Sequence, residues 1–169
     1  YKFSGHDGWA GTAHCGVFDD GNGRVFMVHQ GRLAPRNEMM DLHLRQVFFT
    51  TDGWPVVSPQ RYAGTPERRF QPADLAGVWE IIRVDNPKSD RSLDAGQVLW
   101  GEGGLRNDES SISRTCAVYP DGYLTVAGSH GSWSFDPDRQ LMTMKIGDET
   151  ITDLIVHAGH DWERQTDTV

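Results

Sequence analysis

The chain has 169 residues, and its content of 37% hydrophobic and 24% charged residues excludes an intrinsically disordered protein. The formal net charge is −8 and no basic cluster extends beyond Arg68-Arg69, which argues against a nucleic-acid partner and leaves neutral ligands open. No apolar run approaches the roughly 20 residues that a membrane-spanning helix needs.

The first third of the sequence predicts a small antiparallel sheet. Strands are expected at residues 15–18, 24–29, 42–50 and 55–57, and the first two flank the turn sequence Asp19-Asp20-Gly21-Asn22-Gly23. Four consecutive antiparallel strands are the unit of a propeller blade. A single sheet of this size does not bury its own faces, so residues 1–64 are expected to need neighbours.

The remainder of the chain predicts a second, barrel-like domain. Residues 61–72 contain two prolines, a glycine and several charges, and they indicate a connection between domains. We therefore divide the chain into a blade at 1–64, a linker at 65–73 and a β-barrel at 74–169. One short turn is expected at 73–77, and period-two alternation or apolar content predicts strands at 78–84, 97–100, 115–119, 123–127, 131–135, 140–146 and 150–157.

Longer stretches resemble a known family. GWAGTAHCGVFDDGNGRVFMVHQGR and MDLHLRQVFFTTDGWPVVSPQRYAG are similar to the last propeller blade of an endo-α-1,5-L-arabinanase of glycoside hydrolase family 43. LAGVWEII, GSWSFDP and LIVHAGHDWERQ resemble the C-terminal β-barrel that some of these enzymes carry. The resemblance covers residues 9–64 and 74–165, and DGWPVVSPQRY is its most specific part.

The resemblance implies an all-β fold, in which the last blade of a five-bladed β-propeller is followed by a small antiparallel β-barrel. It implies inverting hydrolysis of α-1,5-linked arabinose, which needs an acid and a base roughly 6.5–9.5 Å apart. The family's catalytic carboxylates belong to earlier blades, and no position here matches them. The chain alone is therefore expected to be inactive. Its expected partners are arabinan and the earlier blades, as a separate chain or a missing segment, with both ends truncated. The family also implies a secreted or periplasmic location.

His14 is the one candidate metal ligand. In the resembling enzymes, a histidine just before this strand points to the propeller axis and helps to hold a cation, usually calcium, whose other partners are mainly water. A single nitrogen ligand among water ligands is unusual for calcium, which prefers oxygen. The alternative is a histidine that is hydrogen-bonded in the core.

Two residues are candidate sugar contacts. Trp9 can stack on a sugar ring, or it can pack between blades. His29 ends a strand and can line the central cavity, or it can bond to the backbone. On the next strand, His43 and Arg45 alternate with leucines, which predicts that they point outward or lie between blades.

Other polar and aromatic residues are assigned to structure. Asp19-Asp20 is explained by turn chemistry, because adjacent strand residues point to opposite faces and make a poor catalytic pair. Asp108-Glu109 lies in a polar loop. His157 and His160 are expected in a loop at the rim of the barrel. Further expectations are a core position for Trp54, Trp79, Trp133 and Trp162, and two buried free thiols at Cys15 and Cys116, with a disulfide as the less favoured alternative.

Two rival functions remain for the barrel. It can be a carbohydrate-binding module that holds sugar on exposed aromatics such as Trp100 or Tyr123. It can also be a purely structural brace for the propeller. Burial of Trp79 and Trp133 without an exposed aromatic row would favour the structural role.

Overall fold

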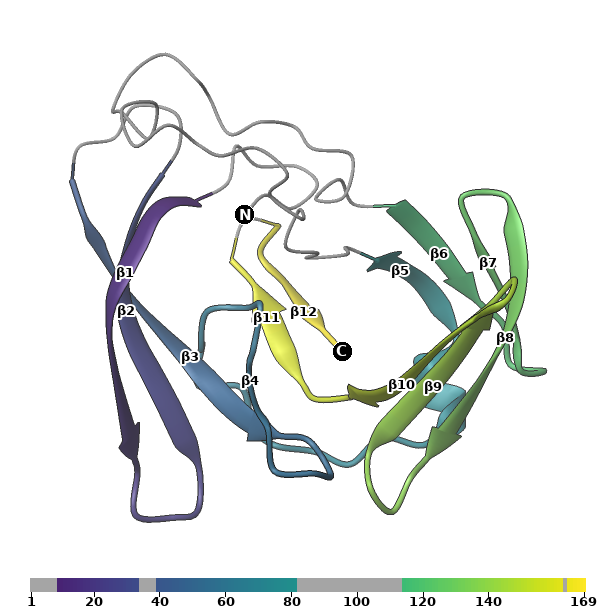
Figure 1. Cartoon of the computed structure of the whole chain (residues 1–169), viewed down its shortest axis with the longest axis horizontal. Coiled ribbons are helices and arrows are strands. Elements are labelled where there is room, and N and C mark those ends of the chain that lie inside the picture. Colours follow the sequence, from purple (N-terminus) through teal and green to yellow (C-terminus); the bar gives the residue numbers. More distant parts are fainter. Residues whose placement is uncertain (1–8, 34–38, 82–113, 163) are drawn as a thin grey trace.

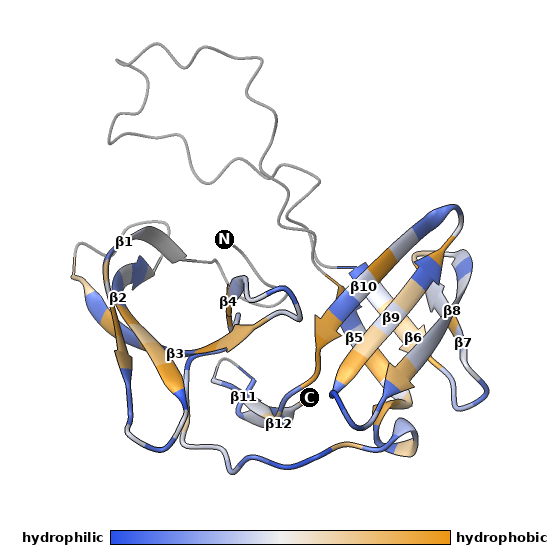
Figure 2. Cartoon of the chain, turned by 60° about the horizontal axis from the view of Figure 1, so that its bottom comes forward, coloured by the Kyte–Doolittle hydropathy of each residue, from blue (hydrophilic) through white to orange (hydrophobic). Residues whose placement is uncertain are grey.

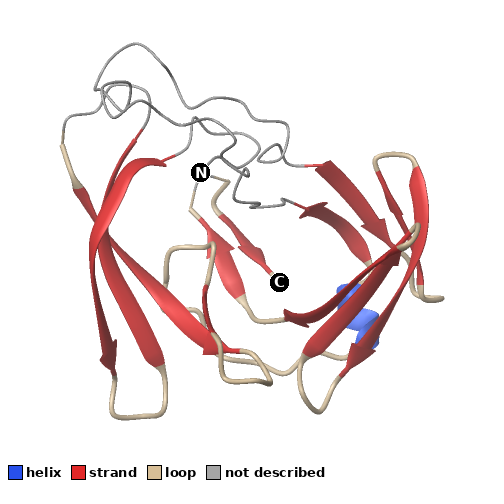
Figure 3. Cartoon of the chain, viewed as in Figure 1, coloured by secondary structure: helices blue, strands red, loops and turns tan. Residues whose placement is uncertain are grey.

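A computed structural model of the chain describes residues 9–33, 39–81, 114–162 and 164–169. The described residues form three antiparallel sheets of four, six and two strands, and one short 3-10 helix, as Figures 1 and 3 show. The predicted all-β class is confirmed. No helix within the described residues is long and apolar enough to cross a membrane.

The four-stranded sheet has the simple order β1-β2-β3-β4. Its strands are β1 (Trp9–Asp19), β2 (Val25–Leu33), β3 (Asp41–Phe49) and β4 (Pro55–Val57). All four predicted strands are present, and β1 begins six residues earlier than expected, because small residues such as Ala10 and Gly11 gave no alternating signal.

The turn between β1 and β2 is built by aspartates, as predicted. The Asp19 carboxylate accepts the backbone N–H of Gly21 at 2.6 Å, and the Asp20 carboxylate accepts that of Asn22 at 2.8 Å. Asp20 also accepts the Nε–H of Arg24 at 2.7 Å. The Asn22 backbone bond, followed by the bonds from Arg24, lowers the pKa of Asp20. These carboxylates are therefore engaged in shaping the hairpin.

The six-stranded sheet curls into an open barrel with the order β10-β9-β8-β7-β6-β5 (Figure 1). A 3-10 helix, η1 (Pro72–Leu75), precedes it and fits the short turn expected there. The strands are β5 (Gly77–Ile81), β6 (Arg114–Val118), β7 (Tyr123–Val126), β8 (Ser129–Asp136), β9 (Leu141–Ile146) and β10 (Glu149–Ile155). The predicted strand at 97–100 lies outside the described residues.

The hydrophobic core lies inside this curled sheet. Alternation along each strand turns one face inward, and the fully buried side chains of Leu124, Met142 and Cys116 meet Phe70 and Leu75 from the segment that precedes β5. Figure 2 shows the apolar residues on β5, β6, β9 and β10 and the hydrophilic turns at the ends of the barrel. The barrel thus carries a core of its own.

A small hairpin and two tryptophans differ from expectation. β11 (Gly159–Asp161) pairs with β12 (Thr166–Thr168), so His160 lies on a strand and not in the predicted rim loop. Trp133 is buried, as predicted, and Trp79 is half-buried. The core position predicted for Trp54 and Trp162 is wrong, because these side chains are 71% and 41% exposed.

Candidate functional site

His14 lies on β1 in an irregular part of the strand. The pairing of β1 with β2 shifts register between Ala10 and Ala13 and again between Ala13 and Gly16. His14 has a φ of 54°, which is uncommon for a residue with a side chain, and such bulges re-aim side chains. Its imidazole is exposed. The core histidine, the alternative interpretation, does not fit this placement.

The donor set around His14 decides how a metal ion could be held there. Calcium takes about six to eight oxygen ligands. Among the residues that the structure describes, no three His, Cys, Asp or Glu side chains are grouped closely enough to hold a metal ion. The metal role of His14 therefore stays a prediction.

Trp9, the first predicted sugar contact, begins β1. Its backbone lies opposite Leu33 at the end of β2. The Trp9 side chain falls outside what the structure describes, so its contact with sugar stays a prediction.

His29 lies in a buried polar cluster. It stands directly opposite His43 in the register of β2 and β3, with ring centroids 4.9 Å apart. Arg45 follows two residues later on the same face, and all three side chains are at most 5% exposed. The expectation that His43 and Arg45 point outward is wrong, and their place between blades stays a prediction. Leu42, which alternates with them, is 78% exposed.

Hydrogen bonds fix the protonation pattern of His29. Nδ1 lies 2.8 Å from the carbonyl oxygen of Gln30, and Nε2 receives the Nε–H of Arg45 at 2.9 Å. A carbonyl only accepts and a guanidinium only donates, so Nδ1 carries the proton and Nε2 does not. Both ring nitrogens are therefore engaged, and the geometry favours the backbone-bonded alternative over a sugar contact.

Arg45 extends the cluster to the segment after β4. Its Nη1 donates to the carbonyl oxygens of Ser58, at 3.3 Å, and of Pro59. Its Nη2 lies 3.4 Å from Nδ1 of His43. Burial, and then the positive charge of Arg45, lower the pKa of His43 to about 4. His43 is therefore neutral at physiological pH, and the cluster holds β2, β3 and the Ser58-Pro59 backbone together.

The Ser58-Pro59-Gln60-Arg61 segment, which follows β4, is also the joint between the two larger sheets. The Ser58 hydroxyl lies 3.4 Å from Nε2 of His157, whose ring packs on Phe48 at a centroid distance of 4.4 Å. The Arg61 guanidinium lies 5.5 Å from the ring centroid of Trp162, and the indole Nε1–H donates to the Arg61 carbonyl at 3.2 Å. Burial lowers the pKa of His157, so this contact is made by a neutral ring. The most specific stretch of the sequence thus joins the sheet to the barrel.

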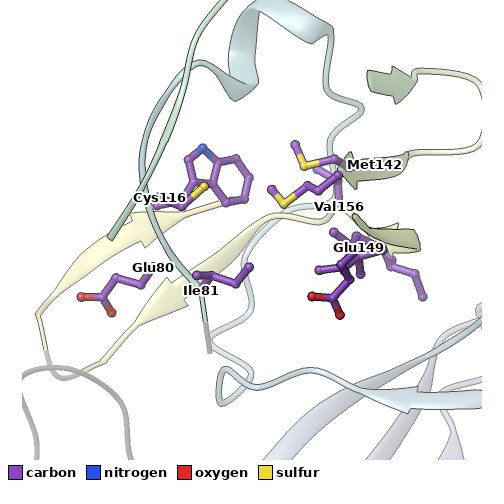
Figure 4. A pocket seen from close by; sticks show the side chains of 11 residues that line it. Glu80, Ile81, Cys116, Met142, Glu149 and Val156 are labelled. Carbon is purple, nitrogen blue, oxygen red and sulfur yellow. The ribbon is translucent and has the colours of Figure 1, made fainter. Parts of the chain in front are cut away.

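A cavity of about 390 Å³ opens between β5 and β10, the two edges of the curled sheet. Cys116 and Met142 lie at one end, and the carboxylates of Glu80 and Glu149 lie at the other (Figure 4). The volume lies within the range of small-molecule sites. Burial raises the pKa of the Cys116 thiol, so its sulfur is protonated and unreactive.

Carboxylates near the barrel are held in ion pairs. Arg164 donates to Glu80 at 2.9 Å and to Asp161 at 2.6 Å. Asp108-Glu109 lies outside the described residues. Cys15 and Cys116 are both free thiols, as the favoured interpretation predicts, and Cys116 is buried, but the burial predicted for Cys15 is wrong because this residue is exposed.

Comparison with known proteins gives consistent results. Residues 59–169 match the sequence model of the GH43_C family, described as a C-terminal lipocalin-like domain. The extracellular endo-α-(1→5)-L-arabinanase 2 of Bacillus subtilis strain 168 is 32% identical over 66 residues, which are 39% of this chain and 14% of that protein.

Two solved structures have the same fold. The glycoside hydrolase family 43 YxiA protein of Bacillus licheniformis aligns with a TM-score of 0.72 at 21% identity, over 98% of this chain and 33% of that chain. The endo-1,5-α-L-arabinanase of Thermotoga petrophila RKU-1 in complex with Tris aligns with a TM-score of 0.69 at 20% identity, over 95% of this chain and 32% of that chain. The chain thus spans about a third of the length of these structures.

Proposed function

Because the chain belongs to the GH43_C family, we propose that it is the C-terminal part of an arabinan-degrading glycoside hydrolase. In this proposal, β1–β4 form the last blade of a five-bladed propeller, and the lipocalin-like barrel braces that blade. Support comes from the arabinanase relative and from the alignment of nearly the whole chain, both sheets included, with a single family 43 protein.

The observation that carries the proposal is that both faces of the four-stranded sheet carry uncovered apolar side chains. Its exposed side chains include Val17 (64%), Leu42 (78%) and Phe49 (55%). Covering each such side chain would contribute about 1.5–3 kcal/mol, so this surface favours association with a neighbouring sheet. The curled sheet, in contrast, has a buried core.

The chemical role of this chain is then to complete and stiffen a scaffold. Inverting hydrolysis needs a protonated and an ionised carboxyl group on opposite sides of the sugar. We place both on the earlier blades, and the carboxylates of Asp20, Glu80 and Asp161 bond to arginines here. The Arg45 cluster and the joint at Ser58–Arg61 hold the last blade rigidly against the barrel.

We further propose a calcium site at the propeller axis and a location outside the cytoplasm. His14 would supply one nitrogen ligand to a calcium ion there, and the ion would supply a fixed positive charge beside the substrate. Trp9 remains a candidate for stacking on arabinose, whereas His29 would act by positioning β2. The extracellular location of the Bacillus subtilis relative supports a secreted or periplasmic enzyme.

The test is reconstitution with a chain that carries the four earlier blades. This chain alone should release no reducing sugar from linear arabinan, and the mixture should. Leu42→Glu should weaken assembly, and Val78→Glu is its matched control, because Val78 is 79% exposed but lies on the barrel. Sugar release by this chain alone, or equal loss of assembly in both variants, would contradict the proposal.

A further inference from the structure

Three rings form a row on the outer surface of the barrel. Along β6, β7 and β8, alternate residues such as Val118, Leu124 and Trp133 are buried, so the residues between them face outward. Tyr119, which directly follows β6, is 43% exposed, and Tyr123, at the start of β7, is 38% exposed. His130 of β8 is also exposed. We call these three residues the aromatic row.

The rings of the aromatic row lie side by side. Tyr119 and Tyr123 have centroids 5.6 Å apart and planes inclined at 38°. Tyr123 and His130 have centroids 5.7 Å apart and planes inclined at 29°. The Tyr123 hydroxyl hydrogen bonds with Nδ1 of His130, so these two rings meet edge to edge. Together they make a shallow plate across three strands, rather than a packed aromatic cluster.

Hydrogen bonds from the buried Trp133 fix the hairpin that carries the aromatic row. The backbone N–H of Trp133 donates to the Gly122 carbonyl at 2.8 Å, and its indole Nε1–H donates to the Tyr119 carbonyl at 2.8 Å. The Tyr119 N–H donates to the Tyr123 carbonyl at 2.9 Å, and the Asp121 carboxylate accepts the Tyr123 N–H at 3.2 Å. The buried Trp133 therefore fixes the turn that carries both tyrosines, and a ligand would meet a preorganised surface.

The surroundings of the aromatic row are polar and include one cation, Lys145, which stands opposite Ser132. Ser132 stands opposite Tyr123, and Thr125 stands opposite His130, so two hydroxyls border the rings. The chain has a net charge of −8, which disfavours an anionic ligand. A flat aromatic surface with hydroxyl groups at its border suits the apolar face of a sugar ring, whose own hydroxyls point sideways to hydrogen-bonding partners.

We propose that the aromatic row is a binding site for a neutral oligosaccharide, with one sugar ring on Tyr119 and another on the Tyr123–His130 plate. The choice of an arabinan chain as the ligand rests on the proposed function. Figures 1 and 2 place β7 and β8 on the side of the barrel away from the four-stranded sheet. The site would therefore hold polysaccharide without obstructing the proposed assembly of the propeller.

The test is titration of the full chain with linear arabinohexaose, and in parallel with xylohexaose, followed by the NMR signals of the three rings. Tyr123→Ala should raise the dissociation constant by about tenfold or more, because it removes the central ring. Tyr123→Phe keeps the ring, loses the bond to His130 and should have a smaller effect. Trp54→Ala is the matched control, because it removes an exposed ring from the other sheet.

The outcomes separate this proposal from the proposed function. Binding of arabinohexaose that Tyr123→Ala weakens and Trp54→Ala does not would support both. Binding of xylohexaose alone at the aromatic row would support the site and contradict arabinan as the substrate. Absence of binding by either sugar, or binding that Tyr123→Ala leaves unchanged, would overturn the site and leave the reconstitution test unaffected.

Discussion

Acidification should destabilise the sheet through His43. The ring is fully buried beside the His29 ring and the Arg45 guanidinium, and burial, then the charge of Arg45, lower its pKa to about 4 from the ordinary 6.5. The folded chain thus favours the neutral ring, whereas the unfolded chain takes up the proton at the ordinary pKa. The stabilising contribution is complete above pH 6.5 and is lost as the pH falls from 6.5 to about 4.

The size of the effect follows from the displacement of the pKa. Each pH unit within this window costs about 1.4 kcal/mol, so acidification across the whole window should remove about 3 kcal/mol from the free energy of unfolding. His43→Gln keeps an acceptor for Arg45 Nη2 but does not titrate. The difference in stability between the original chain and this variant should therefore shrink by about 3 kcal/mol between pH 7 and pH 4.

Two measurements check this reasoning. NMR titration of the imidazole carbons gives the pKa of His43 directly, and urea unfolding at a series of pH values gives the stability difference. A titration midpoint for His43 at or above 6.5 would refute the assignment of its pKa to burial and to Arg45. A stability difference that does not change with pH would refute the linkage to folding.

Two further predictions concern the barrel and the strand β1. Gly131→Ala should destabilise the barrel by about 3 kcal/mol, because the added Cβ would lie 2.1 Å from the Lys145 carbonyl oxygen. Thermal unfolding should show this loss. The control Ser134→Ala, at an exposed position on the same strand, should leave the unfolding temperature unchanged. His14→Ala, made in the assembled enzyme, should weaken calcium binding measured by calorimetry and lower activity without altering the barrel. Equal calcium affinity in the original enzyme and in the variant would show that His14 is not a metal ligand.

Local sequence signals predicted much of the fold. The Asp-Asp-Gly-Asn-Gly turn depends on residues that lie within four positions of one another, and it is present. The alternation along β7 and β9 predicted one buried face for each strand, and Leu124 and Met142 lie on those faces. The three-residue strands β11 and β12 were missed, because Gly159–Asp161 and Thr166–Thr168 contain no apolar alternation.

The polar cluster could not be predicted from β3 alone. The pattern Leu-His-Leu-Arg indicates polar residues on the outside, yet His43 and Arg45 are buried and Leu42 is exposed. Arg45 is buried at low cost because the carbonyls of Ser58 and Pro59, 13 and 14 residues later, accept its protons. That compensation is set by the path of the chain after β4, and alternation within one strand carries no information about it.

The irregular pairing of β1 also has a consequence for solubility. β1 is an edge strand, and a flat edge strand offers its free backbone groups to strands of other molecules. The two register shifts and the left-handed backbone at His14 interrupt the regular spacing of those groups. A second copy therefore meets no long straight ladder on which to add a strand, and the same bulge that re-aims His14 protects the edge against aggregation.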